Sequence, residues 1–253
     1  MSAPGLVAAA RRAWPMPRDV GFIGRKHAAA AMVAGLLLAL PAGAQKASLQ
    51  RGPHRLEIVL ERLDASGWQK IDAGLVLNQN DRVRFRASAN FDGYLYVMNQ
   101  GTSGDYSRLF PREDTGQQNQ IEAGKEYQVP ATEGVFRIAG PPGHEIVYWM
   151  ISPVELGAQP QYAPLPPPPD KKSAPPHLMP RCDDTILRVR GDCVDTSAGP
   201  RAVNDTQLPQ NLAQVPKTGG DELLFVQKEG SSVVSAPPAL AGPVIFEFRL
   251  AHN

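Results

Sequence analysis

The sequence is poor in the residues from which catalytic and metal sites are most often built. Its 253 residues include two cysteines and five histidines, and the four histidines beyond residue 44 each stand alone in their segments. His144 precedes Glu145 but lacks the second histidine, four residues on, that a helical zinc motif requires. No serine lies in a nucleophile-elbow pattern, and no glycine-rich phosphate loop occurs. We therefore expect a protein without metal, cofactor or catalytic activity, the alternative being a site assembled from distant residues.

Neither sign of charge is in excess. The 26 Lys and Arg residues nearly balance the 25 Asp and Glu residues, and residues 45–253 alone hold 21 basic and 24 acidic residues. A protein that binds nucleic acid is expected to carry a basic face or stripe. The composition therefore argues against nucleic acid as a partner.

The apolar run near the N-terminus is too short to cross a membrane. Residues 28–40 carry no charge, and Arg25 and Lys26 stand before them. A membrane-spanning helix needs about 20 apolar residues, whereas the apolar region of a signal peptide needs about 7–15. Residues 1–44 are therefore predicted to be a signal peptide, and no integral membrane span is expected in the mature chain.

The end of this leader has small residues at the positions that a signal peptidase reads. Ala42-Gly43-Ala44 follows the apolar run, so we predict cleavage between Ala44 and Gln45. No cysteine lies at this junction to accept a lipid anchor. The mature chain is thus predicted to be periplasmic or secreted. The start of translation, Met1 or Met16, and the export route are left open.

Proline, glycine and alternating apolar residues are what the sequence has in abundance. Twenty-five prolines and 23 glycines are typical of a loop-rich β protein. In residues 82–89 apolar and polar side chains alternate, which is the pattern of a strand with one buried face. The apolar set consists of Val83, Phe85, Ala87 and Ala89. Asn90-Phe91-Asp92-Gly93 then predicts a reversal of the chain into a second strand at 94–98.

Other segments also have the character of strands. They are residues 54–63, 106–110, 125–129, 135–139, 223–226 and 244–250. Residues 146–151 are so apolar that we expect a central strand with both faces covered. The set predicts an all-β fold, an antiparallel immunoglobulin-like β-sandwich over residues 54–152.

The composition changes after residue 152. Ten of the residues 153–180 are prolines, which favours extended polyproline II, so we expect a linker or a surface strap there. A ligand for aromatic-lined grooves is the alternative for the proline run at 166–169. Residues 181–222 are predicted to be a loop region. Residues 223–253 are predicted to return to the sandwich, because an isolated strand pair is barely stable in water.

The two cysteines, Cys182 and Cys193, both follow the predicted leader. An even pair in an oxidising compartment predicts a disulfide. Two thiols without further His or Cys ligands at suitable spacing do not favour a zinc site.

Several ordered motifs make the centre of the sequence similar to a bacterial family. They are Gly93-Tyr94-Leu95-Tyr96, Leu109-Phe110-Pro111, Ile121-Glu122-Ala123-Gly124, Tyr127-Gln128-Val129-Pro130 and Gly140-Pro141-Pro142-Gly143-His144-Glu145. Over about residues 56–152 the chain resembles the uncharacterised domain of unknown function four-three-eight-four. The resemblance implies an exported or envelope β domain, which in other chains is sometimes joined to caspase-like peptidases or protein kinases. Neither of these occurs here, and the resemblance implies no specific function.

Aromatic residues and arginines gather around one predicted hairpin and the loop after it. They are Tyr94, Tyr96, Tyr106, Arg108 and Arg112. Such residues suit sugars, peptides or protein surfaces. The alternative is cross-strand pairing that only stabilises the sheet.

Together these features predict an exported, non-catalytic interaction or accessory module of the bacterial cell envelope. Its partner is expected to be a protein or another envelope component. The alternatives are a hydrolase-like envelope enzyme with a dispersed site and a carbohydrate- or peptidoglycan-binding module. The sequence leaves the biological process and the oligomeric state open.

Overall fold

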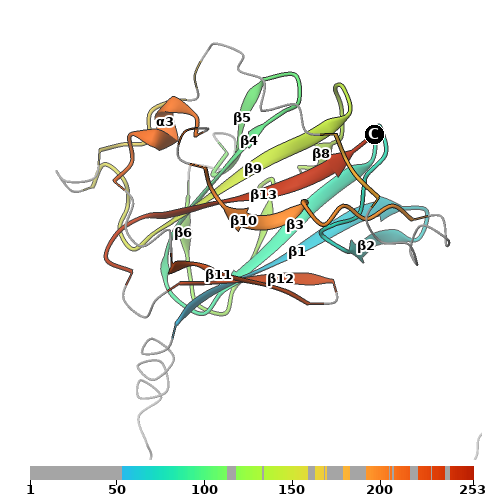
Figure 1. Ribbon diagram of the computed structural model, residues 1–253. Helices are drawn as coiled ribbons and strands as arrows, with labels where there is room; N and C mark the ends of the chain where they lie inside the picture. The colour runs from blue at the N-terminus through green and yellow to red at the C-terminus, as the bar shows by residue number, and fades with distance from the viewer. Residues whose placement is uncertain are drawn as a thin grey trace, which may run out of the picture. The chain divides into compact units, whose positions relative to one another are not determined.

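Two antiparallel β-sheets pack face to face in the computed structural model, which confirms the predicted all-β sandwich (Figure 1). The structure describes residues 53–112, 118–132, 134–158, 163–167, 169, 179–182, 192–204, 206, 208–216, 222–228, 230–236 and 240–253. The predicted signal peptide, its cleavage point between Ala44 and Gln45, and most of the proline-rich segment lie outside these residues. Within them, no helix has the length and apolar character that a membrane span requires.

The first sheet joins the N-terminal strand to a hairpin near the C-terminus. Its strands lie in the order β11 (Leu224–Lys228), β12 (Ser231–Ala236), β1 (His54–Asp64), β3 (Arg82–Ala89) and β7 (Glu126–Val129). Two short strands lie beside this path: β2 (Gly67–Ile71) pairs with β1, and β8 (Phe136–Arg137) pairs with β3. Because β1 lies between β12 and β3, it connects the two halves of the sheet.

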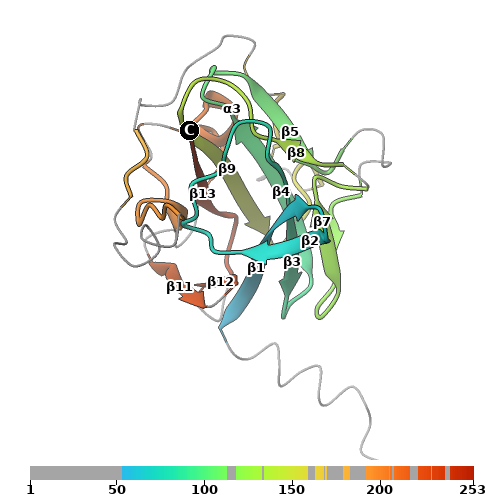
Figure 2. The same cartoon turned by 90° about the vertical axis from the view of Figure 1, so that its right-hand side faces the viewer.

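The second sheet holds the most buried strands of the molecule. Its order is β10 (Gly199–Ala202), β13 (Val244–His252), β9 (Gly143–Ser152), β4 (Gly93–Gln100) and β5 (Tyr106–Phe110), and β6 (Gln120–Ile121) pairs with β4. All of β13 pairs with β9, and the two strands lie side by side in Figure 2. The prediction that the C-terminal strand returns to the sheet is therefore confirmed.

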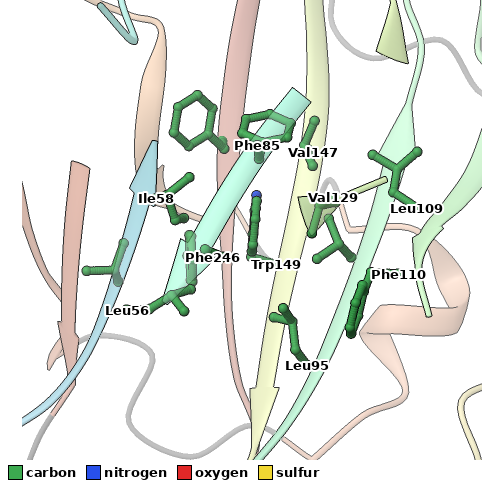
Figure 3. Close-up of a cluster of buried hydrophobic side chains, with 14 of the residues drawn as sticks. Leu56, Ile58, Phe85, Leu95, Leu109, Phe110, Val129, Val147, Trp149 and Phe246 are labelled. Atoms are coloured by element: carbon green, nitrogen blue, oxygen red, sulfur yellow. The ribbon is translucent and has the colours of Figure 1, made fainter. Parts of the chain in front are cut away.

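Side chains of both sheets interlock in the core between them (Figure 3). The apolar residues of β3 all point inward and are buried, as their alternation predicts. The ring of Phe85 meets the rings of Trp149 and Phe248 edge-on, with centroid distances of 5.5 and 5.2 Å. Trp149 in turn stacks on Phe246. Each such aromatic pair contributes about 0.5–1.5 kcal/mol beyond the area that it buries.

The link between β3 and β4 differs from a hairpin turn. The chain reverses at Asn90-Phe91-Asp92-Gly93 as predicted, but β3 pairs with β1 and β7, whereas β4 lies in the other sheet. The Asn90 carboxamide oxygen accepts a hydrogen bond from the Arg55 amide at 2.7 Å, which ties the link to β1. Two neighbouring strands with the same period can thus belong to different layers, because alternation reports a buried face and not a pairing partner.

The second sheet is covered on its outer face as well. Every residue of β9 is buried, which confirms the predicted central strand. The outward side chains of the sheet form an apolar cluster with residues that follow the family-like segment: Met98, Ile146, Tyr148, Met150 and Ile245 pack against Leu156, Leu212 and Val215. Leu212 belongs to a short helix, α3 (Gln210–Ala213). Described residues that follow the family-like segment therefore cover the outer face of this sheet.

The disulfide and several short elements lie in the C-terminal third. Cys182 and Cys193 form a disulfide, with their Cα atoms 4.9 Å apart. The Cys193 carbonyl accepts a hydrogen bond from the Val76 amide at 2.7 Å, so Cys193 is tied to the sandwich. The predicted loop region 181–222 also contains β10 and α3, and β2 and β12 were not predicted as strands either.

Candidate functional site

The five residues of the predicted binding surface do not form one patch. Tyr94, Tyr96, Tyr106, Arg108 and Arg112 are all half-buried, but they lie in different surroundings. Tyr94 lines an open groove, whereas Tyr96 and Arg108 line a small cavity under the C-terminal third. Their role in binding a ligand stays a prediction. Tyr94 stands apart from Tyr96, Tyr106 and Arg108, and the Arg112 guanidinium lies beside Gly134.

Tyr96, Tyr106 and Arg108 belong to the contact between the second sheet and the residues that cover it. The Tyr96 hydroxyl accepts a hydrogen bond from the Leu156 amide at 3.0 Å, and burial raises the pKa of this tyrosine. The Gln100 amide donates to the Tyr106 hydroxyl at 2.6 Å. The cavity that Tyr96 and Arg108 line has a volume of about 20 Å³, which is room for a water molecule and not for a ligand.

Tyr94 lies in a groove of about 690 Å³ whose lining comes from both sheets. β4 and β6 of the second sheet contribute one wall, and β7 of the first sheet contributes the other. The polar and aromatic residues of the lining include Tyr94, Gln118, Asn119, Gln120, Lys125 and Tyr127. A groove of this size, with aromatic rings and side-chain amides together, has the residue types that bind peptides and sugars.

The second tyrosine of the groove is held by three neighbours. The Tyr127 hydroxyl accepts a hydrogen bond from the Glu122 amide at 2.8 Å, and the Lys125 ammonium lies 5.5 Å from the ring centroid. Phe110 meets the Tyr127 ring edge-on at 6.2 Å. The loop between β6 and β7 is fixed from outside by Asp92, whose carboxylate accepts a hydrogen bond from the Ala123 amide at 2.8 Å. Contacts within the protein therefore hold the Tyr127 ring and the loop before it in place without a ligand.

The charged groups of the groove are two carboxylates and one ammonium. Glu122 and Lys125 form an exposed ion pair at 3.4 Å, and Glu155 lies elsewhere in the lining. Among the lining residues that the structure describes, negative charge is therefore in slight excess. This balance favours neutral or cationic polar ligands over anions.

Sequence reasoning identified only Tyr94 of this groove as a binding candidate. Phe110, Glu122 and Tyr127 were noted for another reason, since they belong to the motifs that carry the family resemblance. These motifs are far apart in the sequence and converge only because β4, β6 and β7 meet at one edge of the sandwich. Their shared membership of the motif set is the signal in the sequence from which the groove could have been found.

A buried polar cluster lies elsewhere, between β9 and the loop before β10. The His144 Nε2 atom is 3.2 Å from the Asp195 carboxylate and 3.3 Å from the Ser197 hydroxyl. His144 stands alone in its segment of the sequence, and in the fold it is buried. The Asp195 loop covers the start of β9, and no pattern in the sequence predicted this contact.

This cluster contains the residue types of a serine hydrolase without their geometry. In a catalytic triad the serine and the aspartate contact opposite nitrogens of the histidine. Here both approach the same nitrogen, and the Ser197 hydroxyl donates its hydrogen bond to Asp195 at 2.6 Å. The Ser197 oxygen is thus not activated by His144, and the arrangement serves to fix the loop.

Asp195 is the centre of this loop. Its carboxylate accepts hydrogen bonds from the Arg181 and Ser197 amides at 2.9 and 2.8 Å. Burial acts to raise the pKa of Asp195, but the hydrogen bonds from Ser197 and Arg181 outweigh it, so the pKa lies below its usual value. The charged form of Asp195 therefore contributes to the folded structure.

A second buried pair lies next to it on the same strands. The His252 Nε2 atom is 3.5 Å from the Glu145 carboxylate, which also accepts a hydrogen bond from the Asn99 amide at 3.0 Å. Across the part of the chain that the structure describes, no group of three or more His, Cys, Asp and Glu side chains is arranged to hold a metal ion. Both pairs link β9 to its neighbours, and neither opens into the groove.

The comparisons with known proteins single out the segment that forms the groove. No curated protein and no solved structure matches the chain. The match to a family model begins at residue 76, later than the residue 56 expected from the motifs. It includes every described residue that lines the groove. Residues 76–155 match the family described as Domain of unknown function (DUF4384), which confirms the family that the ordered motifs predicted.

Proposed function

We propose that the chain is an exported, non-catalytic interaction module of the cell envelope, and that the groove around Tyr94 is its binding surface. One observation carries this proposal: all described residues that line a groove of about 690 Å³ belong to the segment that matches the family. Four of its lining residues come from the motifs of the resemblance: Tyr94, Phe110, Glu122 and Tyr127. A binding role explains why these motifs converge on one open surface.

The lining also supports a second, narrower function, that of a carbohydrate-binding module. Sugars bind proteins through aromatic rings that cover their apolar faces and through amides that bond their hydroxyl groups. Tyr94 supplies a ring, and Gln118 and Gln120 supply exposed amides beside it. Peptidoglycan is a suitable test ligand because it presents sugars and peptides on one polymer.

The test is binding of the purified chain and its Tyr94→Ala variant to cell-wall sacculi and to periplasmic proteins. Loss of an anchor residue in a binding site costs about 2 kcal/mol, or roughly thirtyfold in affinity. Trp68→Ala is the matched control, because Trp68 is a half-buried aromatic residue on β2, outside the groove. Binding that survives Tyr94→Ala and fails in Trp68→Ala would refute the assignment of the groove. Sedimentation with sacculi separates the carbohydrate function from binding to a protein.

Export is tested independently of the groove. The disulfide between Cys182 and Cys193 is compatible with an oxidising compartment. We expect the exported form to begin at Gln45, and intact-mass spectrometry of the periplasmic fraction measures this directly. A chain that keeps residues 1–44, or that stays in the cytoplasm, contradicts both the cleavage point and the compartment.

A further inference from the structure

We propose that two copies of the chain associate through β11, so that their first sheets join into one continuous antiparallel sheet. β11 is the last strand at its end of the sheet, and within the described residues β12 is the one strand that pairs with it. An end strand of this kind is a template for another strand. The occupant that the strand fits best is a second β11, and this inference is independent of the groove.

The other three strands at the ends of the two main strand orders contain a proline or are followed at once by one, and β11 is not. β10 contains Pro200, while β7 and β5 are followed at once by Pro130 and Pro111. The pairing of β5 with β4 is also shifted by an irregularity. Proline cannot donate to a ladder, and bulges and prolines are common protections of sheet edges. β11 reads Leu-Phe-Val-Gln-Lys and has neither.

Two apolar side chains of β11 are among the most exposed large apolar side chains of the described residues. Leu224 is 62% exposed and Val226 is 39% exposed, and they lie two residues apart on one face of the strand. Elsewhere the outer face of the first sheet is ionic: Arg84 pairs with Glu61 at 2.6 Å, and Arg86 pairs with Glu126. Leu224 and Val226 therefore place exposed apolar surface at the end of the sheet where a second copy would join.

The sequence of β11 is self-complementary in one antiparallel register. Residues that lie opposite each other must face the same way, so only registers centred on a residue are allowed. In one register the two-fold axis passes between the two copies of Phe225. Leu224 then lies opposite Val226 of the second copy, and Glu222 lies opposite Lys228 of the second copy. Centring on Val226 instead sets Leu224 against Lys228. Only the register at Phe225 pairs apolar with apolar and acid with base.

The symmetry of this register doubles each contact. The Glu222–Lys228 contact and the Leu224–Val226 contact each occur twice, once on either side of the axis. Lys228→Glu would therefore place like charges together at both ends of the interface. Glu222→Lys would do the same, and the double variant Glu222→Lys with Lys228→Glu would restore both attractions with the charges exchanged.

The test is the oligomeric state of the full chain over a concentration series, measured by sedimentation velocity. We expect a monomer–dimer equilibrium for the natural chain, and roughly a tenfold weaker dimer for either single charge reversal. The charge-exchanged double variant is expected to regain the natural affinity to within about threefold. Val135→Lys is the matched control, because Val135 is another exposed apolar residue, at 42%, that lies outside β11.

The variants change exposed residues, so their folding is checked by circular dichroism before the dimer is measured. A natural chain that stays monomeric over the whole series overturns the proposal. A dimer that tolerates both single reversals overturns the register, as does a double variant that fails to regain affinity. A dimer that is lost in Val135→Lys assigns the interface to another surface.

Discussion

Two buried carboxyl groups have pKa values that are shifted in opposite directions, Asp195 beside the second sheet and Glu247 within it. Asp195 accepts enough hydrogen bonds to lower its pKa in spite of burial. Glu247 is buried on β13, and there burial raises the pKa although Arg249 and Arg201 act to lower it. The contributions of the two groups to the free energy of unfolding therefore change with pH in opposite directions.

Asp195→Asn should destabilise the folded chain at neutral pH by about 1–3 kcal/mol, because the carboxylate accepts several hydrogen bonds in a buried loop. A carboxyl group with a lowered pKa contributes stability above its unfolded value of 3.8, and the contribution is lost as the pH falls through the folded pKa. Denaturant unfolding at pH 7 and at about pH 3 measures this. A difference between the two proteins that does not shrink at low pH would contradict the role given to the charged form.

Glu247→Gln should show the opposite dependence. A carboxyl group whose folded pKa is raised stabilises the fold most below its unfolded value of 4.5, and this contribution is lost as the pH rises through the folded pKa. We therefore expect the difference in unfolding free energy, variant minus natural chain, to increase as the pH rises from acid to neutral. The attraction of Arg249 for the ionised carboxylate is already part of the folded pKa of Glu247, so the slope of the stability difference against pH is the measured quantity. A slope of the reverse sign refutes the prediction.

At the residue scale the sequence predicts which side chains face inward only where a pattern repeats. Val83 and Phe85 are buried as their alternation indicates. His144 and His252 lie just outside the predicted strands 146–151 and 244–250, and their burial follows from the pairing of β9 with β13 and from the Asp195 loop. Tyr96 looked like a surface residue for the same reason, since its cover begins sixty residues later at Leu156.

Strands as elements were predictable where a regular apolar pattern is long. β1, β3, β9 and β13 were found in the sequence, and each lies in the middle of a sheet. β12 reads Ser-Ser-Val-Val-Ser-Ala and β10 reads Gly-Pro-Arg-Ala, so neither has the composition of an isolated strand. These two form because β1 and β13 present them with a ladder to join. Tertiary context decides such elements, and no local signal exists for them.

The disulfide acts at the scale of one loop. We expect Cys182→Ser with Cys193→Ser to lower the unfolding free energy by roughly 3 kcal/mol, because the cross-link closes a short loop and limits the unfolded chain. Thermal unfolding of the oxidised natural chain, the reduced natural chain and the double variant tests this. Reduction and substitution should agree, and their disagreement would show that serine changes the packing of Cys193 against the sandwich. Equal midpoints for all three would contradict a stabilising disulfide.

For the whole molecule, the segment that matches the family is not a complete sandwich in this chain. Residues 76–155 include β3 to β9 but not β1, β12 or β13. β1 is the middle strand of the first sheet, and β13 pairs with β9 in the second. The segment that matches the family forms the groove, and strands on either side of this segment complete the two sheets on which it is built.

A chain that ends at Ser152 should therefore be unstable or aggregate. The truncation removes β13, so it uncovers an edge of β9 and deletes Phe246 and Phe248 from the core. Each of these buried rings contributes up to about 1.5–3 kcal/mol, and an open apolar edge promotes aggregation. Solubility and thermal unfolding of the fragment measure the effect. Co-expression with a second fragment, residues 179–253, should restore a folded complex if β13 belongs to this sandwich. A fragment that ends at Ser152 and melts cooperatively at the midpoint of the full chain would show instead that the C-terminal third is a separate unit.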